Sequence, residues 1–176
     1  MGPICSILLN RKIDFEEIQQ VDEFLKSIVK GDIKSTKSAR DFWVDSTKFP
    51  KLNAEGSNCQ FSFHFDNKLN FMDEDEMLEI EIVLGFTVQS QVSISAGCNQ
   101  VGDHNVLGEL ALEIAKILNG LIDFHGDLNI YKKGITEELE GQVYAIEYNE
   151  GMAECHIIDS EFMSHWLKHP NFRMIK

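Results

Sequence analysis

The 176-residue chain lacks the features that define several large classes of protein. It has no run of about eighteen apolar residues, which a membrane-spanning helix needs, so we expect no membrane segment and a cytoplasmic protein. Lys and Arg number only 16 against 29 Asp and Glu, which leaves a formal net charge of −13. Since phosphate contacts need a basic patch, this balance argues against nucleic-acid binding, whereas it permits a basic protein partner.

Cysteine and the common motifs of catalytic and metal sites are also sparse. No two of the four cysteines form a CxxC motif, and the four are Cys5, Cys59, Cys98 and Cys155. We therefore expect neither a disulfide framework nor a zinc ribbon, and interpret them as small buried side chains in a reducing compartment. The glycine-rich GCNQVGDHN has no Lys-Ser/Thr after its second Gly, and Trp166 follows His165 where HExxH has Glu. No cofactor is expected.

The segment from Asp103 to Leu121 has the strongest helical pattern in the chain. Its apolar residues recur at the spacing of one helical stripe, and they are Val106, Leu107, Leu110, Ala111, Ile114, Ile117, Leu118 and Leu121. Asp103 or Asn105 can cap the start, and a left-handed Gly in Asn119-Gly120 is expected to end the helix. Small residues such as Gly108 allow a close approach to a sheet, so we expect this to be the most buried helix.

The remaining pattern predicts a mixture of strands and helices. Alternating or buried apolar runs predict strands over 4–9, 40–45, 61–65, 92–96, 121–124, 127–131, 143–148 and 152–158. Further helices are expected over 14–30, over 135–139 and after Asp159 or Ser160, with a loop over 32–38. Residues 72–84 alternate like a strand, but their acidic start and Gly85 favour a helix over 73–84. The sequence therefore predicts one α+β domain over 1–176, with a mostly antiparallel or mixed sheet and three to four packed helices.

Two acids and a histidine occupy alternate positions in LIDFHGD. In a continuous strand Asp123, His125 and Asp127 would project to one face, where they could bind a divalent cation or act as acid and base. Asp103 and His104, in the preceding loop, could add ligands. The alternative is a solvated face or turn capping, because Gly126 can break the alternation.

Cys98 is the second candidate for chemistry. It lies at the turn from a strand into a helix, where a helix N-terminus can lower a thiol pKa, and His104 or His125 could serve as base. A packed small side chain is the alternative. With the acids and histidines above, these residues define an alternative function, that of a small metal-dependent or acid–base hydrolase.

Clustered carboxylates are the candidate residues for binding a partner. One cluster is Asp73, Glu74, Asp75 and Glu76, and the other is Glu137, Glu138 and Glu140. Each could meet a basic surface, because opposite charges attract over long range. Solvated helix starts would have the same composition.

Two segments resemble a bacterial family of small uncharacterised proteins. They are DHNVLGELALEIAKILNGLIDFHGDL, over 103–128, and CHIIDSEFMSHWLKHPNFRMIK, over 155–176. Such families resemble the immunity proteins of bacterial toxin systems in size, acidity and single-domain organisation. That resemblance implies a non-enzymatic protein that neutralises a basic toxin by binding it, and it brings no catalytic motif.

Overall fold

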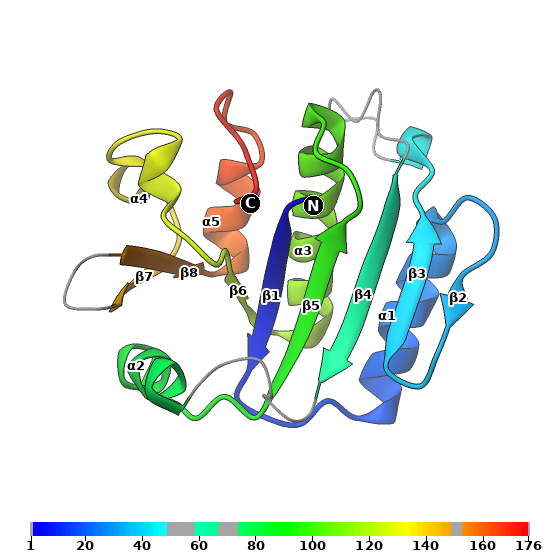
Figure 1. Cartoon of the computed structure of the whole chain (residues 1–176), viewed down its shortest axis with the longest axis horizontal. Coiled ribbons are helices and arrows are strands. Elements are labelled where there is room, and N and C mark those ends of the chain that lie inside the picture. Colours follow the sequence, from blue (N-terminus) through cyan, green and yellow to red (C-terminus); the bar gives the residue numbers. More distant parts are fainter. Residues whose placement is uncertain (1, 49–58, 67–73, 149–152, 176) are drawn as a thin grey trace.

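The fold is built on one eight-stranded sheet, and the computed structural model describes residues 2–48, 59–66, 74–148 and 153–175. The strands are β1 (Ile4–Leu9), β2 (Lys34–Ser35), β3 (Ala39–Trp43), β4 (Gln60–Asp66), β5 (Ser90–Ala96), β6 (Leu121–Asp123), β7 (Val143–Tyr148) and β8 (Ala153–Ile158). Their order is β2-β3-β4-β5-β1-β6-β8-β7, and every neighbouring pair is antiparallel. The predicted α+β fold with an antiparallel sheet is confirmed (Figure 1).

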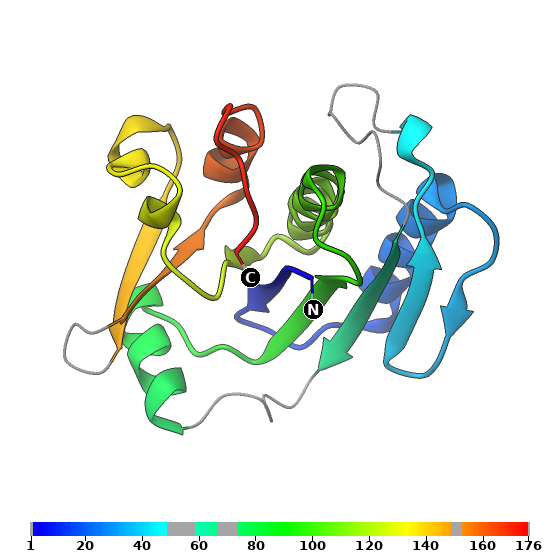
Figure 2. The same ribbon diagram turned by 45° about the horizontal axis from the view of Figure 1, so that its top comes forward.

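Helices cover both faces of this sheet. They are α1 (Phe15–Ile28), α2 (Glu74–Leu84), α3 (Val101–Leu118), α4 (Ile135–Glu138) and α5 (Ser160–Trp166), with 3-10 turns over Ser46–Lys48 and Leu128–Ile130. Figure 2 shows α3 above the central strands and α2 below the opposite face. Within the described ranges, none of these helices combines the length and apolar character that crossing a bilayer demands.

Alternation along β1 explains why there are two hydrophobic cores. Ile7 is buried in the larger core, which α1, α3 and α5 share, whereas Leu8 is buried in a smaller core with Ile80 of α2, Ile146 and Ile157. Successive side chains of a strand point to opposite faces, so α2 must lie on the face away from α3. The rest of that second face, over β3, β4, β5 and β1, carries mostly polar side chains.

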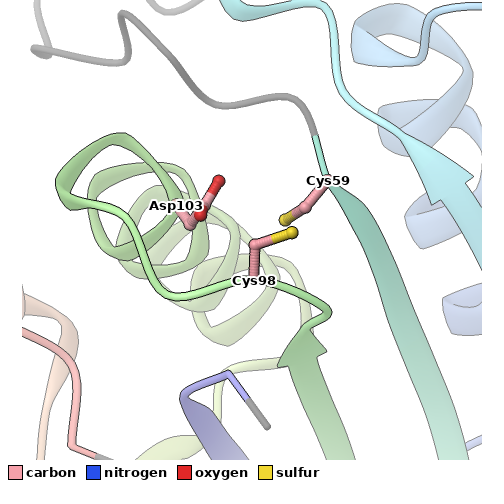
Figure 3. A group of neighbouring side chains, drawn as sticks. All are labelled: Cys59, Cys98 and Asp103. Carbon is pink, nitrogen blue, oxygen red and sulfur yellow. The ribbon is translucent and has the colours of Figure 1, made fainter.

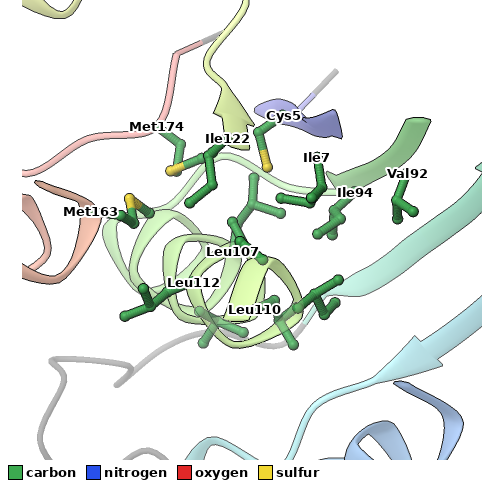
Figure 4. Close-up of a cluster of buried hydrophobic side chains, with 14 of the residues drawn as sticks. Cys5, Ile7, Val92, Ile94, Leu107, Leu110, Leu112, Ile122, Met163 and Met174 are labelled. Atoms are coloured by element: carbon green, nitrogen blue, oxygen red, sulfur yellow. The ribbon is translucent and has the colours of Figure 1, made fainter. Parts of the chain in front are cut away.

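The predicted central helix is confirmed, and α3 supplies much of the larger core (Figure 4). It begins at Val101, two residues earlier than expected. Asp103 therefore lies in the first turn, where its Oδ2 accepts a hydrogen bond from the backbone N–H of Gln100 at 2.8 Å. The left-handed residue at the end is Asn119, with φ 49°, rather than Gly120. Gly120 is needed for close packing, since a Cβ there would lie 2.5 Å from Cγ2 of Ile7.

Gly108 of α3 has a different neighbour from the one expected. A Cβ at this position would lie 2.5 Å from Cζ of Phe172 and 2.8 Å from Cδ2 of Leu167, so it faces α5 and the segment after it. The glycine thus lets α5 approach α3, and the sheet contact of α3 depends on its other buried side chains.

Most other local predictions are confirmed, and two are wrong. The capping box of α1 forms, with Asp14 and Glu17 exchanging hydrogen bonds of 2.9 and 3.1 Å. Residues 74–84 are helical, and the β7–β8 hairpin forms. The loop over 32–38 contains the short strand β2, and the expected strand over 127–131 is instead the 3-10 turn Leu128–Ile130.

Candidate functional site

The five residues predicted as possible metal ligands lie at four separate places, one of them occupied by His104 with Asn99 and Met174. In the described part of the chain, two groups of three potential ligands come together, and they are Cys59 with Cys98 and Asp103, and Asp127 with Glu154 and His156. Asp123 and His125 form a pair in a third place. The predicted set of five therefore does not converge, because the chain turns between its members.

His104 is held by hydrogen bonds to the protein itself. Its Nδ1 accepts a hydrogen bond from the backbone N–H of Met174 at 3.1 Å, and its Nε2 lies 3.0 Å from Oδ1 of Asn99. Because Nδ1 accepts, the ring hydrogen is on Nε2 and is donated to Asn99. Both nitrogens of this buried ring are thus occupied, and His104 fastens the C-terminal segment to α3.

Asp127 also has a structural role. It caps the 3-10 turn by accepting a hydrogen bond from the backbone N–H of Asn129 at 2.7 Å. His156 beside it accepts from the backbone N–H of Leu128 at Nδ1, and its Nε2 lies 3.2 Å from Oε1 of Glu154. With both ring nitrogens of His156 engaged, this group stabilises a bend and offers a cation no free imidazole nitrogen.

Asp123 and His125 do meet, although not through strand alternation. His125 has φ 55°, so the strand ends and the chain folds back. Asp123 accepts a hydrogen bond at Oδ1 from the backbone N–H of His125 at 2.8 Å, and its Oδ2 lies 3.4 Å from His125 Nδ1. The Cys155 thiol donates to the same carboxylate at 3.3 Å. Burial and this carboxylate both raise the pKa of Cys155, which keeps the thiol protonated as a donor.

Ser6 extends this pair into a chain of three polar side chains. Its Oγ lies 2.7 Å from Nε2 of His125 and accepts a hydrogen bond from Nε2 of Gln91 at 2.5 Å. The order is therefore Asp123, His125, Ser6, with one imidazole nitrogen toward the carboxylate and the other toward the hydroxyl. Ser6, Gln91 and His125 border a cavity of about 370 Å³ on the polar face of the sheet, which His64 and Ser93 also line, whereas Asp123 is buried behind His125.

Cys98 is exposed, which corrects the expectation of a buried packed side chain. Its neighbours are the buried Cys59, just before β4, and the buried Asp103 of α3 (Figure 3). The predicted bases are not among them, because His104 is bonded to Asn99 and Met174, and His125 to Ser6 and Asp123. Burial raises the pKa of Cys59 to about 12, and Asp103 adds to the rise.

The outward side of α2 is an exposed surface of mixed apolar and acidic character. Leu78 and Ile82 are 57% and 70% exposed, and Asp75 and Glu79 are exposed beside them. These four residues follow the i, i+3, i+4, i+7 spacing of one helical face. The helix has five acidic residues and no basic one, while its opposite side packs through Ile80. Asp73 lies outside the described residues.

The second acidic cluster, around α4, is partly neutralised. Glu138 forms an ion pair with Lys132 and lies 3.9 Å from Nε2 of His169. The hydrogen bond from Lys132 lowers the pKa of Glu138. Glu137 and Glu140 are exposed. In contrast, no lysine or arginine among the described residues pairs with Asp75 or Glu79, so α2 retains the stronger local negative charge.

Two residues of these sites, Ser6 and Cys59, have no signal in the sequence. Ser6 looked like an ordinary strand residue, and only the polar face shared with Gln91 distinguishes it. Cys59 has no local signal, because its neighbour Cys98 is 39 positions away and meets it through strand register.

Comparison with known proteins gives a family and no activity. No curated protein and no solved structure matches the chain. The model of DUF6368, described as a family of unknown function, matches residues 1–176. The chain therefore belongs to the DUF6368 family.

Proposed function

We propose that this protein is a non-enzymatic binding protein that docks a basic protein partner on the outward face of α2. The observation that carries the proposal is the exposure of Leu78 and Ile82 beside Asp75 and Glu79 on one helical face. An apolar centre with charged neighbours is the usual composition of a protein interface. Because the helix has no basic residue, a cationic surface fits it and a nucleic acid or an anionic membrane does not.

The exposed apolar side chains give this surface its binding energy, and the carboxylates give it selectivity. Burying an exposed Ile or Leu against a partner contributes roughly 1.5–3 kcal/mol. Opposite charges add mainly to the association rate and to the choice of partner, in a salt-dependent way. The outward face of α2 thus differs from a solvated helix face, on which large apolar side chains would have no role.

The partner class that we propose is a bacterial toxin with a basic active site. The support is the resemblance of residues 103–128 and 155–176 to families that resemble immunity proteins, together with the net charge of −13. The protein would act by covering the toxin's cationic surface with the carboxylates of α2. This mechanism needs no catalytic residue and no cofactor.

A binding measurement with matched charge variants tests the proposal. The probe is the product of any toxin-like gene found beside this protein's gene, and the readout is the Kd from calorimetry. The test variant is Asp75→Lys/Glu79→Lys, and the control is Glu137→Lys/Glu140→Lys on the α4 cluster. Each replacement raises the net charge by two, so both double variants change from −13 to −9.

We expect the α2 variant to lose about 100-fold or more in affinity, which is about 2.7 kcal/mol, and the α4 variant to lose less than about threefold. Ile82→Ser should weaken the affinity for the partner about tenfold. Equal weakening by both charge variants would mean that only the overall charge matters. That result, or a toxin-like domain that does not bind the wild-type protein, contradicts the proposal.

A second candidate function is an acid–base hydrolase, and the chain of Asp123, His125 and Ser6 favours it. The carboxylate lies by Nδ1 of the imidazole and the hydroxyl by Nε2, which is the order in which a histidine takes a proton from a serine nucleophile. The imidazole is 32% exposed, whereas Ser6 is fully buried. A substrate would therefore enter the cavity over His125.

A fluorophosphonate reagent tests this second candidate without knowledge of the substrate. A reactive Ser6 should be phosphonylated, with the labelled peptide found by mass spectrometry, and His125→Ala should slow the labelling at least tenfold. Ser95→Ala, which alters another hydroxyl that lines the same cavity, is the control and should label normally. An unlabelled wild-type protein, or labelling that survives Ser6→Ala, rules the hydrolase out.

A further inference from the structure

Cys59 and Cys98 are brought together by the register of β4 and β5. The last ladder pair is Phe61 with Ala96, and the backbone N–H of Gly97 then donates to the carbonyl of Gln60 at 2.7 Å. One residue beyond the pair of Gln60 and Gly97, the same register sets Cys59 opposite Cys98. Since Gln60 and Gly97 share a hydrogen bond, the next position is a non-hydrogen-bonded pair, in which facing side chains are closest.

Asp103 completes the group from the first turn of α3. The two thiol sulfurs and a carboxylate oxygen all lie within 4.8 Å of one another, and Figure 3 shows the two thiols facing each other beside Asp103. The Cys59 thiol donates a hydrogen bond to Asp103. A second bond, from the backbone N–H of Gln100 to Oδ2, fixes the carboxylate at 2.8 Å. Such outer contacts are what orient metal-binding carboxylates.

We propose that Cys59, Cys98 and Asp103 bind a thiophilic divalent cation, for which Zn²⁺ has the best-matched chemistry. Two sulfurs and one carboxylate oxygen are ligands that zinc accepts, with Zn–S of about 2.3 Å and Zn–O of about 2.0–2.2 Å in a tetrahedral site. Those bond lengths require ligand atoms about 3.4–3.8 Å apart. Small side-chain rotations achieve this from the present separation, and water takes the fourth position.

The surroundings of the group suit an ion that binds from solvent. Cys98 is exposed and provides the entry path, whereas Cys59 and Asp103 are buried. On binding, each thiol transfers its proton to solvent as its S–Zn bond forms, and the cation replaces the thiol hydrogen that now bridges Cys59 and Asp103. The N-terminus of α3 stabilises the resulting negative ligands.

Metal titration of the whole protein tests this inference. The reduced protein is freed of metal by a chelator, kept under a phosphine reductant, and titrated with Zn²⁺ against a chromophoric chelator and separately with Co²⁺. We expect one equivalent of each ion and a sulfur-to-cobalt charge-transfer band. Bound Zn²⁺ should also raise Tm, because it binds the folded state.

Three variants separate the site from adventitious binding. Cys59→Ala/Cys98→Ala should lose the cobalt band and the zinc equivalent, and Asp103→Asn, which retains the acceptor for Gln100, should weaken zinc at least tenfold. Cys155→Ser, which alters a cysteine elsewhere, should bind as wild type. Circular dichroism verifies that each variant is folded. The proposal is overturned if the double cysteine variant binds zinc as wild type does. It is equally overturned if the reduced wild-type protein takes up no zinc and the two thiols only form a disulfide with oxidised glutathione.

Discussion

We expect the ion pair between Asp22 and Arg40 to stabilise the packing of α1 against β3. Both guanidinium contacts are short, with Nε 2.8 Å from Oδ1 and Nη2 3.0 Å from Oδ2. The arginine side chain is only 10% exposed and the aspartate 25%. Asp22→Ala would leave two N–H groups of a buried cation without their acceptors.

The loss in the free energy of unfolding on replacing Asp22 by Ala can be estimated from this geometry. Breaking a fully buried pair costs about 3–5 kcal/mol. Here Nη1 retains the carbonyls of Thr36 and Ala39, and water can reach the aspartate side of the pair, so we expect Asp22→Ala to cost about 2 kcal/mol. Arg40 also loses packing on Phe65 when it is replaced, since its Cζ lies 5.5 Å from the ring centroid.

Urea unfolding of a double-mutant cycle measures the pair itself. Asp22→Ala, Arg40→Ala and the double variant should give a coupling of about 1–2 kcal/mol. The control is Glu113→Ala, which removes the exposed ion pair with Lys116 and should cost less than about 0.5 kcal/mol. A cost for Asp22→Ala no larger than that of the control would refute the reasoning.

Three further outcomes are expected. Gly141→Ala should lower the free energy of unfolding in urea by about 3 kcal/mol or more, because φ is 118° and the new Cβ would lie 2.2 Å from the backbone nitrogen of Phe162. The control is Gly134→Ala, which should lower it by about 1 kcal/mol, because φ is 79° but the space around the new Cβ is open. The free energy of unfolding should fall as pH rises above about 8.5, because buried thiols such as Cys155 have a raised pKa and stay protonated while those of the unfolded chain ionise. Cys155→Ala should make that fall shallower, and an unchanged slope would count against it. His104→Ala should speed hydrogen exchange in the segment after α5, and unchanged protection there would contradict its fastening role.

The parts of the fold with a repeating pattern were predictable, and the parts set by single residues were not. The stripe along α3 and the Asp14 capping box depend on local spacing, which sequence shows directly. The turn after β6 depends on one left-handed residue, His125, and alternation cannot reveal it. The apolar pattern therefore predicts a strand over 127–131, although Asp127 caps a 3-10 turn there.

The candidate sites were predictable only where their members are close in sequence. The sequence predicts the pair Asp123 and His125 because the two residues are two positions apart, although they meet through a turn and not on one strand face. The pairing of Cys59 with Cys98 depends on β4–β5 register, and the contact of Ser6 with His125 depends on the pairing of β1 with β6. Such contacts across the sheet leave no spacing signal. The exposed face of α2 was visible only as charge until the fold fixed which side is buried.

Hydrogen–deuterium exchange of the complex with the neighbouring toxin-like domain tests the central claim most directly. If the outward face of α2 is the docking surface, amide protection on binding should concentrate in residues 74–84, with little change in β3 and β4. Protection confined to the polar sheet face around His125, with α2 exchanging as in the free protein, would contradict it.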